Sequence, residues 1–519
     1  MAKRGAMMTL PLFLGLGGSG GQGSGSGVMG AAAASATINA LPDVSASETL
    51  NVGILIMPGI FISEATIPFD MYKHVPDNKM NTYFVAESME PVWTYYGTRL
   101  KPDYTFSNAP TADVLVIPSG IGSHDSFLTS WYGGVVNSDG MIEGRTQNNK
   151  PVTYYGNMTN LIDWVKEASA AAQIVTSHCW GAFTLGDAGV LDGKVATTFP
   201  GYTETLDTYY PAISSVVSDK RWVIDGKVMT SNGALAAFEA CLTVIRHIYG
   251  ETVANNIVTG LVLSPENVGH SKDQYFRPSP AAGDLETMKK AKVAILLLEG
   301  TFISEPAAPF DILAHLGPDC EVYFVGETMN PIQTYYKATM YPDYTLANAP
   351  TADIIVLPSA INSRTSDRNK TAVIDWIQAG AASATWITSH CWGAFLLCEA
   401  GLCDGKTVTT FPGYFDELKT AFPAIKTVVE NRRIVQDGKL VTSNGGVAAY
   451  EAANYVVMKH WGVNRAKKVA TGLVFSADNW EAQENAYVET SDHETSGAIG
   501  SAALLVAPLV LSFLAGAQA

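Results

Sequence analysis

The heptapeptide Ser177-His178-Cys179-Trp180-Gly181-Ala182-Phe183 occurs twice in the chain, the second time as Ser389-His390-Cys391-Trp392-Gly393-Ala394-Phe395. The two copies lie 212 residues apart. The same offset relates 198–202 (TFPGY) to 410–414, and 230–233 (TSNG) to 442–445. Self-similarity at a fixed offset is the sequence signature of a duplicated structural unit.

The repeat extends upstream, where the offset changes. Residues 61–64 (FISE) match 302–305 at an offset of 241, and 108–113 (NAPTAD) match 348–353 at 240. The first copy therefore carries a net insertion of about 28 residues, which we place at about 122–157. We place the two domains at 50–265 and 291–481, joined by a polar, proline-bearing linker at 266–290.

Length and composition agree with several folded domains. The chain has 519 residues, which favours two to four domains, and 47% hydrophobic against 16% charged residues allows large cores to form. The net charge is −16, and no basic run is long enough to follow a phosphate backbone. We therefore exclude nucleic acid as a partner.

The two ends differ in composition from the rest. Residues 1–36 resemble a secretory signal that ends at Ala34-Ser35-Ala36, and a disordered leader is the alternative. Residues 498–519 carry no charge and follow a polar spacer at 482–497, as in a glycolipid-anchor signal, with a simple tail anchor as the alternative. We expect a membrane-tethered protein of the secretory pathway or cell surface; the alternative is a cytoplasmic one.

Two glycosylation sequons begin at Asn157 and Asn369, and their threonines are alternatively simple caps of the helices that follow. Six cysteines are too few for a disulfide scaffold, and none forms a Cys-x-x-Cys metal pair. We expect no metal and no cofactor. Cys398 and Cys403 occur only in the second copy, where we expect them to pack independently rather than as an oxidised pair.

Short apolar runs alternate with helical patterns in each copy. The predicted strands are 52–57, 82–86, 114–117 and 173–176, with counterparts at 293–298, 322–325, 354–357 and 385–388; helices are predicted at 67–74, 161–171 and 181–188. Nearly continuous hydrophobicity is typical of strands buried on both faces. The pattern predicts three-layer α/β domains with mostly parallel sheets, whose ligands gather at the carboxyl ends of the strands.

Cys179 and Cys391 each follow a predicted strand and precede a predicted helix, with glycine two residues later. A nucleophile at such a turn projects from the sheet edge, and the helix amino terminus favours a thiolate. We therefore expect two reactive cysteines with lowered pKa values. The alternative is a pair of inert buried cysteines that pack as small apolar side chains.

Glu64 and Glu305 follow the first strand of each copy and open on the same sheet edge as the cysteines. In an apolar environment such a carboxyl has a raised pKa, so that it can donate to a thiolate or relay a proton. An acid that only interacts with the dipole of its own helix is the alternative.

The order of these motifs resembles the DJ-one/ThiJ/PfpI superfamily (class I glutamine-amidotransferase-like), and most closely its isonitrile hydratase and regulator-amidase branch. The motifs are 64–70 (EATIPFD), 114–120 (VLVIPSG), the strand-to-helix turn at Cys179, 191–198 (LDGKVATT) and 225–233 (DGKVMTSNG). The second copy repeats them. The resemblance implies two tandem flavodoxin-like domains, which we expect to pack as an intramolecular pseudo-dimer. It also implies a nucleophilic cysteine with a hydrogen-bonded acid in each domain.

The chain departs from the family pattern in two places. Phe199 and Phe411 stand where many members have a histidine, which argues against a histidine-dependent protease or amidase. Pro-Ser-Gly at 118–120 and Pro-Ser-Ala at 358–360 replace Pro-Gly-Gly. Backbone N–H groups there and at the tryptophans are still expected to form an oxyanion hole from Ser119, Gly120, Trp180, Ser359, Ala360 and Trp392.

Two further pairs of residues are possible site residues. His178 and His390 precede the nucleophiles and are expected to point to the opposite face, so a structural role is favoured over a catalytic one. Asn232 and Asn444 lie in the repeated TSNG segment. Paired tyrosines at 95–96 and 335–336 either line the pocket or pack in the core.

Two functions follow as hypotheses. The first is a cysteine-dependent enzyme, a hydratase or hydrolase or a glyoxalase-like lyase, that attacks a small-molecule electrophile while glutamate moves the proton. The second is a non-catalytic redox-sensing or ligand-binding protein whose cysteine is oxidised to a sulfinic acid.

Overall fold

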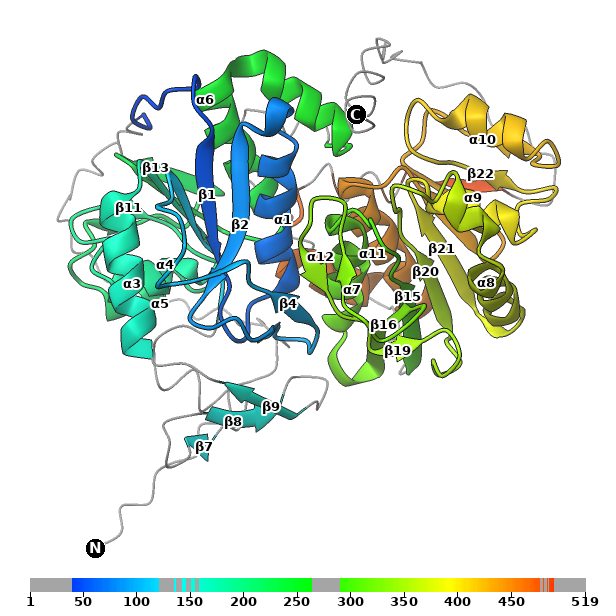
Figure 1. Ribbon diagram of the computed structural model, residues 1–519, viewed down its shortest axis with the longest axis horizontal. Helices are drawn as coiled ribbons and strands as arrows, with labels where there is room; N and C mark the ends of the chain where they lie inside the picture. Colours follow the sequence, from blue (N-terminus) through cyan, green and yellow to red (C-terminus); the bar gives the residue numbers. More distant parts are fainter. Residues whose placement is uncertain are drawn as a thin grey trace, which may run out of the picture.

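The computed structural model describes residues 40–120, 135–136, 142–145, 151–154, 158–263, 290–476, 479, 483 and 485–489. Two α/β units lie side by side, the first built from the amino-terminal copy and the second from the carboxyl-terminal copy (Figure 1). In both, buried apolar strands form a central sheet, and helices cover its two faces. The predicted three-layer α/β architecture with mostly parallel sheets is confirmed.

The first sheet has seven strands in the order β13-β14-β10-β6-β1-β2-β5. All neighbours pair in parallel except β13 and β14, which form an antiparallel hairpin at one edge. The strands are β1 (Leu50–Leu55), β2 (Met80–Ala86), β5 (Tyr104–Thr105), β6 (Val114–Ile117), β10 (Ile174–His178), β13 (Trp222–Asp225) and β14 (Val228–Ser231).

The second sheet repeats this order and adds one strand, which gives β19-β16-β15-β20-β21-β25-β24-β26. The additional strand, β26, pairs in parallel with β24. In the first sheet, the corresponding edge ends with β13. The strands are β15 (Ala291–Leu296), β16 (Cys320–Gly326), β19 (Tyr344–Thr345), β20 (Ile354–Leu357), β21 (Trp386–His390), β24 (Ile434–Asp437), β25 (Leu440–Ser443) and β26 (Tyr487–Glu489).

Each sheet has one helical layer that faces the other unit and one that faces outward. In the first unit these layers are α1 with α6, and α3 with α4; in the second they are α7 with α11, and α8 with α9. The helices are α1 (Ile62–Lys73), α3 (Met158–Ala171), α4 (Gly181–Asp187), α5 (Thr203–Tyr209), α6 (Ala236–Gly260), α7 (Ser304–Ala314), α8 (Thr371–Ser383), α9 (Gly393–Glu399), α10 (Phe415–Ala421), α11 (Val447–Trp461) and α12 (Val463–Gly472).

Short elements complete the units. A four-stranded sheet, β17-β18-β4-β3, crosses from one unit to the other because β18 pairs antiparallel with β4. Its strands are β3 (Val92–Trp93), β4 (Arg99–Lys101), β17 (Ile332–Gln333) and β18 (Thr339–Met340). The remaining elements are β11 (Val195–Ala196) with β12 (Ser215–Val216), β22 (Thr407–Val408) with β23 (Thr427–Val428), β7 (Val135–Val136) with β8 (Ile142–Arg145) and β9 (Pro151–Tyr154), and the 3-10 turns 76–78, 317–319 and 366–369.

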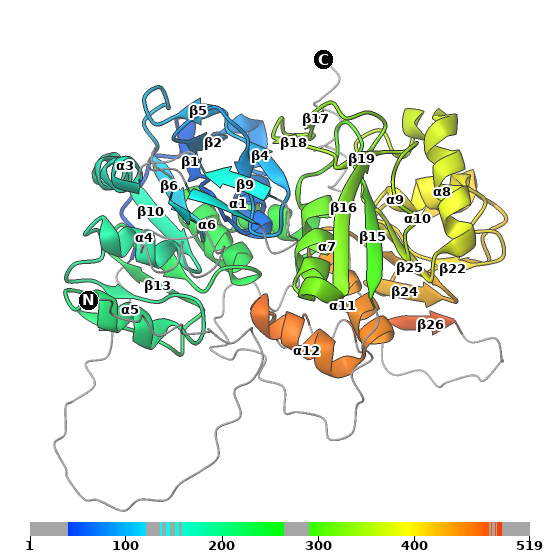
Figure 2. The ribbon, with the colours of Figure 1, turned by 90° about the horizontal axis from the view of Figure 1, so that it is seen from below.

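The units meet along α1 and α7, which lie next to each other between the two sheets (Figure 2). The contacts are reciprocal, as a pseudo-two-fold axis requires. Asp311 Oδ2 accepts the Ser63 N–H at 3.0 Å, and Asp70 Oδ2 accepts the Ser304 hydroxyl. Tyr450 OH adds a bond of 2.9 Å to Ser63 Oγ. The expected pseudo-dimer packing is therefore present, and buried polar groups fix its register.

A second reciprocal contact joins the ends of the last helices. Leu235 N–H donates to Leu473 O at 3.2 Å, and Val447 N–H donates to Leu261 O at 2.9 Å. Each unit therefore supplies a carbonyl group to the start of the other unit's long helix, where backbone N–H groups lack partners within the helix.

Several expectations fall outside the described residues. The leader, most of the insertion, Asn157, the polar spacer apart from a few of its residues, and the hydrophobic tail all do so. Asn369 is exposed at the end of the 3-10 turn before α8, and glycosylation there stays a prediction. Within the part of the chain that the structure describes, no helix combines the length and apolar character needed to cross a membrane.

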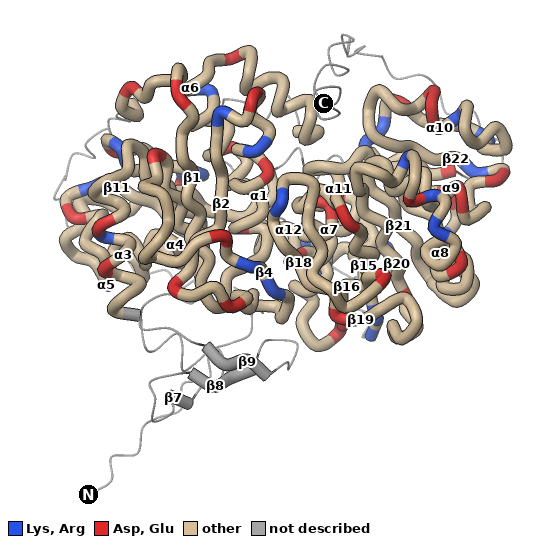
Figure 3. Tube along the Cα trace, viewed as in Figure 1, with Lys and Arg blue, Asp and Glu red and all other residues tan. Residues whose placement is uncertain are grey.

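Charged side chains are interspersed over both units. Lys and Arg positions and Asp and Glu positions are both scattered over the described chain trace (Figure 3). The whole chain has 33 basic and 49 acidic residues, which leaves an excess of negative charge.

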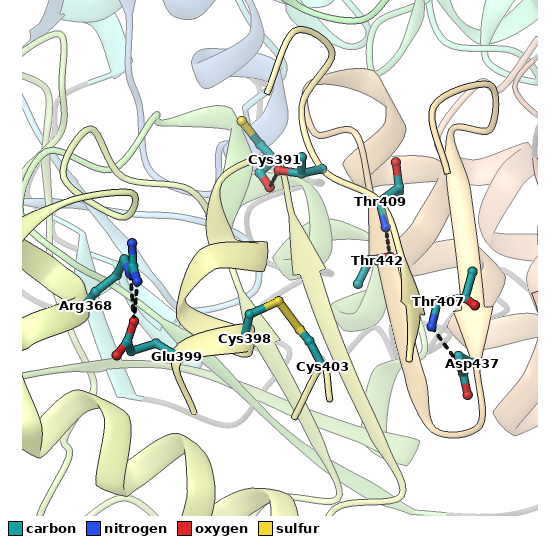
Figure 4. The surroundings of a disulfide bond; sticks show 10 residues. Arg368, Cys391, Cys398, Glu399, Cys403, Thr407, Thr409, Asp437 and Thr442 are labelled. Atoms are coloured by element: carbon teal, nitrogen blue, oxygen red, sulfur yellow. Dashed lines mark hydrogen bonds and ion pairs between the residues drawn. A yellow bond between two sulfur atoms is a disulfide. The ribbon is translucent and has the colours of Figure 1, made fainter. Parts of the chain in front are cut away.

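The expectation for Cys398 and Cys403 was wrong, because the two form a disulfide bond. Cys398 lies near the end of α9, and Cys403 lies in the turn that follows, with their Cα atoms 4.7 Å apart. The helix brings the two thiols together, which their spacing in the sequence alone did not indicate. The bond joins α9 to the following turn at the end of the helix opposite Cys391 (Figure 4).

Replacing Gly446 with Ala tests the contact between the units. A Cβ there would lie 2.1 Å from Leu261 O, and the residue has a φ of 55°, so backbone strain and a clash both oppose the change. Gly401 is the control for positive φ, because its φ is 73° and no atom would meet its Cβ within 4 Å. In chemical denaturation we expect Gly401→Ala to cost about 1–2 kcal/mol and Gly446→Ala about 1–3 kcal/mol more. Equal costs would contradict the packing described for this contact.

Candidate functional site

Each candidate nucleophile lies in a strained turn between a strand and a helix. Cys179 follows β10 with a φ of 53°, and Cys391 follows β21 with a φ of 52°. Positive φ is unfavourable for residues other than glycine and persists only where the surroundings impose it. Glycine two residues later is required for space, because a Cβ at Gly181 would lie 2.0 Å from Ile117 O and one at Gly393 equally close to Leu357 O.

A hydrogen-bond network holds the turn. Cys179 N–H donates to Ser231 O at 2.9 Å, and the Thr198 hydroxyl donates to Cys179 O at 2.7 Å. Asn232 Nδ2 in turn donates to Thr198 O at 2.6 Å. The second copy has the same network, with Thr410 and Asn444 in these places. The two asparagines singled out in the sequence therefore support the turn through threonine.

The two candidate acids approach their cysteines from the first helix of each unit. Glu64 Oε1 accepts the Ala234 N–H at 2.5 Å, and Glu305 Oε1 accepts the Gly446 N–H at 2.7 Å. A Cβ on Gly233 would lie 2.4 Å from both Cys179 Cβ and Glu64 Oε1. The acid and the cysteine therefore converge on one glycine, and Gly445 occupies the same place beside Cys391 and Glu305.

Burial determines the charge of both acids. It raises the pKa of Glu64 to about 8. The hydrogen bond from the Ala234 N–H lowers this pKa, and the nearby charge of Asp311 raises it. Burial likewise raises the pKa of Glu305 to about 8, helped by the charge of Asp70. Both carboxyls are thus mainly protonated at neutral pH. Their second oxygens, Oε2, have no hydrogen-bond partner among the described residues.

The expected lowering of the cysteine pKa values was wrong. Burial raises the pKa of Cys179 well above its ordinary value, and the charge of Glu64 raises it further. The Trp180 N–H and the Ser119 hydroxyl act in the opposite direction, without offsetting burial. Cys391 behaves in the same way beside Glu305. Desolvation of the charged form therefore outweighs the favourable end of a seven-residue helix.

A cavity opens beside Cys179. The empty space inside it, counted together with the open mouth, is about 390 Å³. Its lining is mostly apolar and consists of Phe61, Glu64, Cys179, Trp180, Phe199, Ala234, Asp311, His315, Gly472 and Leu473. Asp311, His315, Gly472 and Leu473 belong to the second unit.

Aromatic rings form one wall of this cavity. Trp180 packs edge-on against Tyr202 with centroids 5.0 Å apart, and Phe61 packs against Tyr95 at 4.8 Å. Tyr96 is buried and lies 5.2 Å from the ring of His315. Tyr95 and Tyr96 therefore lie behind the wall. Tyr96 is next to His315, a histidine of the second unit that the sequence analysis did not single out.

His178 and His390 do not face the cavity. His178 Nδ1 lies 2.7 Å from Ser231 Oγ, and its Nε2 lies 4.0 Å from Cys241 Sγ, in the core. His390 Nδ1 lies 2.8 Å from Ser443 Oγ. Burial lowers the pKa of each histidine to about 3, so both are neutral. This placement favours the structural role over the catalytic one.

The residues expected in the oxyanion hole are partly used elsewhere. The Ala360 N–H donates to Ser363 Oγ at 2.9 Å. It therefore does not serve the oxyanion hole as expected. The Ser359 N–H faces Glu305, and the Trp180 and Trp392 N–H groups face the sulfur atoms. At Gly120 a Cβ would lie 2.2 Å from Met57, so the chain packs closely there. The Ser119 and Ser359 hydroxyls lie beside the thiols instead.

The second site carries a cation that the sequence analysis did not single out. Arg364 stacks over Trp392 at 4.4 Å and over Tyr414 at 4.3 Å, and it forms an ion pair with Glu417 at 2.7 Å. Its charge lowers the pKa of Cys391, although burial remains the larger effect. Among the described residues, no group of three or more His, Cys, Asp or Glu side chains is placed to hold a metal ion.

Comparison with known proteins agrees with this geometry. The sequence profile of the DJ-1/PfpI family matches residues 150–247 and 291–459. The isonitrile hydratase of Pseudomonas putida is 27% identical over 259 residues, which cover 50% of this chain and 96% of that protein. Protein DJ-1 homolog B of Arabidopsis thaliana is 26% identical over 287 residues, 55% of this chain and 62% of that protein.

One solved structure also aligns with part of the chain. Drosophila melanogaster DJ-1beta aligns with a TM-score of 0.34 and 24% identity, over 36% of this chain and 100% of that chain. The family profile covers both copies of the nucleophile turn and about half of all residues. The chain therefore belongs to the DJ-1/PfpI family, and it contains the family's unit twice.

Proposed function

We propose that this protein is a cysteine-dependent enzyme that adds water to the electrophilic carbon of a small molecule, with an isonitrile as the substrate class and a formamide as the product. One observation carries the proposal: a protonated, buried glutamic acid with an unpartnered oxygen converges with a strained cysteine beside a small apolar cavity. A related protein named isonitrile hydratase, nearly all of which aligns with this chain, supports the substrate class.

The first half of the reaction uses both protons of the site. Glu64 gives its proton to the terminal carbon of the isonitrile, and the Cys179 sulfur attacks that carbon as the C–S bond forms. The thiol proton passes to the glutamate carboxylate, which restores the acid. The product is a thioimidate, R–N=CH–S–Cys179. A carboxyl with a pKa of about 8 suits this step, because it holds its proton at neutral pH and releases it readily.

The second half adds water. The water oxygen attacks the thioimidate carbon while Glu64 protonates the nitrogen, and the hydroxyl proton then returns to Glu64 as the C–S bond breaks. The formamide R–NH–CHO leaves, and the sulfur takes up the other proton of the attacking water. One isonitrile and one water give one formamide, with no oxidant or reductant. The apolar wall of Phe61, Phe199 and Trp180 suits a small uncharged substrate.

A redox function is the second candidate at the family level. The protonated carboxyl of Glu64, whose Oε2 has no partner among the described residues, would also donate a hydrogen bond to a sulfinate on Cys179. Mild peroxide distinguishes the two functions. A sensor gains a stable sulfinic acid at Cys179 or Cys391 under conditions in which no isonitrile is converted, whereas the proposed enzyme converts isonitriles in the reduced state.

Turnover tests the role of the acid. In Cys391→Ser protein, which retains only the first nucleophile, we expect small isonitriles to be converted to formamides at a rate that falls as pH rises through about 8, because Glu64 then loses its proton. Glu64→Gln should reduce the rate by about 10²–10⁴-fold. Glu321→Gln, an exposed control, should not change it. A rate that rises through pH 8 would contradict a protonated acid as the donor.

Alkylation tests the coupling between acid and thiol. In Cys391→Ser protein, the rate at which iodoacetamide modifies Cys179 should reach half its maximum above the ordinary thiol pKa of about 8.5, because burial disfavours the thiolate. Glu64→Gln should lower that midpoint, because it removes the negative charge that the thiolate faces at high pH. Glu305→Gln, at the other site, should leave it in place. Mass spectrometry of the Cys179 peptide measures the rate, and an upward shift in Glu64→Gln would refute the coupling.

A further inference from the structure

The cavity beside Cys179 is built by both units. The first unit supplies the nucleophile and the acid, and the second supplies Asp311 and His315 at the end of α7 together with Gly472 and Leu473 at the end of α12. His315 is the lining residue with a neutral nitrogen base. The site therefore contains a histidine from the other unit, whereas His178, which precedes Cys179 in the sequence, faces the core.

The tautomer of His315 follows from its hydrogen bond. Nδ1 lies 2.8 Å from the backbone carbonyl oxygen of Asp311, and a carbonyl oxygen only accepts, so Nδ1 carries the proton. Nε2 then bears a lone pair. Burial lowers the pKa of His315 to about 4, which leaves the ring unprotonated at neutral pH.

Packing fixes the ring beside the cavity. It lies 6.0 Å from Phe61 and 5.2 Å from Tyr96, both in the first unit. A Cβ on Gly472 would lie 3.5 Å from Nε2 and 3.2 Å from Cδ2, so glycine leaves room at the Nε2 edge of the ring. Asp311, one turn earlier, accepts the Ser63 N–H at 3.0 Å and so ties α7 to the residue before Glu64.

We propose that His315 is the general base of the first site and activates the water that releases the product from Cys179, so that each turnover there uses side chains of both units. Nε2 takes a proton from water as the oxygen bonds to the carbon attached to sulfur. The C–S bond then breaks, and the imidazolium returns that proton to the departing sulfur. This role rests on the proposed function to the extent that both require a covalent intermediate on Cys179.

The duplication provides a comparison. His74 ends α1 as His315 ends α7, and its Nδ1 lies 2.8 Å from Asp70 O. Unlike His315, it also has the Asp70 carboxylate 3.4 Å away, and a Cβ on Gly260 would lie 3.6 Å from its Cδ2. His74 does not line the Cys179 cavity. Removing the same ring from the two positions therefore separates an effect at this site from a general effect on the interface.

The experiment uses the full chain with Cys391→Ser and p-nitrophenyl acetate, an ester that leaves an acetyl group on Cys179 whether or not isonitriles are substrates. Mass spectrometry of the Cys179 peptide follows hydrolysis of the thioester. His315→Asn keeps a donor at the Nδ1 position but removes the base, and we expect the acetyl group to persist about 10²-fold longer. The increase in the lifetime of the acetyl group should be at least tenfold smaller in His74→Asn than in His315→Asn.

Chemical rescue keeps the proposal testable if His315→Asn folds poorly. In His315→Ala protein, free imidazole should restore hydrolysis in a saturable manner, because it can fill the space beside the cavity. An unchanged lifetime in His315→Asn, an equal effect of His74→Asn, or the absence of rescue in folded His315→Ala protein would overturn the proposal. Failure of isonitrile turnover with normal thioester hydrolysis would instead refute the proposed function and leave the role of His315 standing.

Discussion

The packing of α1 against α7 is the contact on which the rest of the structure depends. Eleven of the twelve residues of α1 are buried, and so are all those of α7. Each helix carries the acid of its own site in its first turn and a histidine at its end, and the carboxyls of Asp70 and Asp311 bind the partner helix in between. Both units thus share the electrostatics of their sites, because Asp311 raises the pKa of Glu64 and Asp70 that of Glu305, each in addition to burial.

The two sites are similar in plan and different in detail. In the second, a disulfide bond between Cys398 and Cys403 closes the end of the helix that begins after Cys391, and Arg364 covers Trp392. The first copy has Gly186 and Leu191 in place of these cysteines, so it lacks the bond. The two copies share the turn at the cysteine, the acid, and the supporting threonine and asparagine. They differ around the helix that follows the turn, which is α4 in the first copy and α9 in the second.

Much of the fold and part of the site could be predicted from the sequence because they depend on local patterns. Buried strands such as 114–117 and 354–357 are continuous apolar runs, and the structure has both at the predicted residues. The Cys179 turn was recognisable from the strand before it and the glycine after it. The placement of Glu64 beside Cys179 followed from the rule that loops after parallel strands open on one edge.

What could not be predicted depends on burial and on contacts between the copies. The sign of the Cys179 pKa shift was wrong because a helix terminus is visible in sequence, whereas the depth of a thiol below the surface is not. His315 lies 136 residues from Cys179 and belongs to the other repeat, so no spacing connects them. A signal was present in retrospect, since the duplication itself implied a two-fold contact, and the histidines at 74 and 315 occupy equivalent positions in it.

The central claim is that each candidate nucleophile, Cys179 or Cys391, lies beside a glutamic acid that keeps its proton at neutral pH. Infrared difference spectroscopy of the full chain against Glu64→Gln and Glu305→Gln measures this directly, through the C=O stretch of a protonated carboxyl. We expect each variant to lose one such band at pH 6, and the bands of the unaltered protein to disappear with a midpoint near pH 8. Spectra that show only carboxylate at Glu64 and Glu305 at pH 6 would contradict the account.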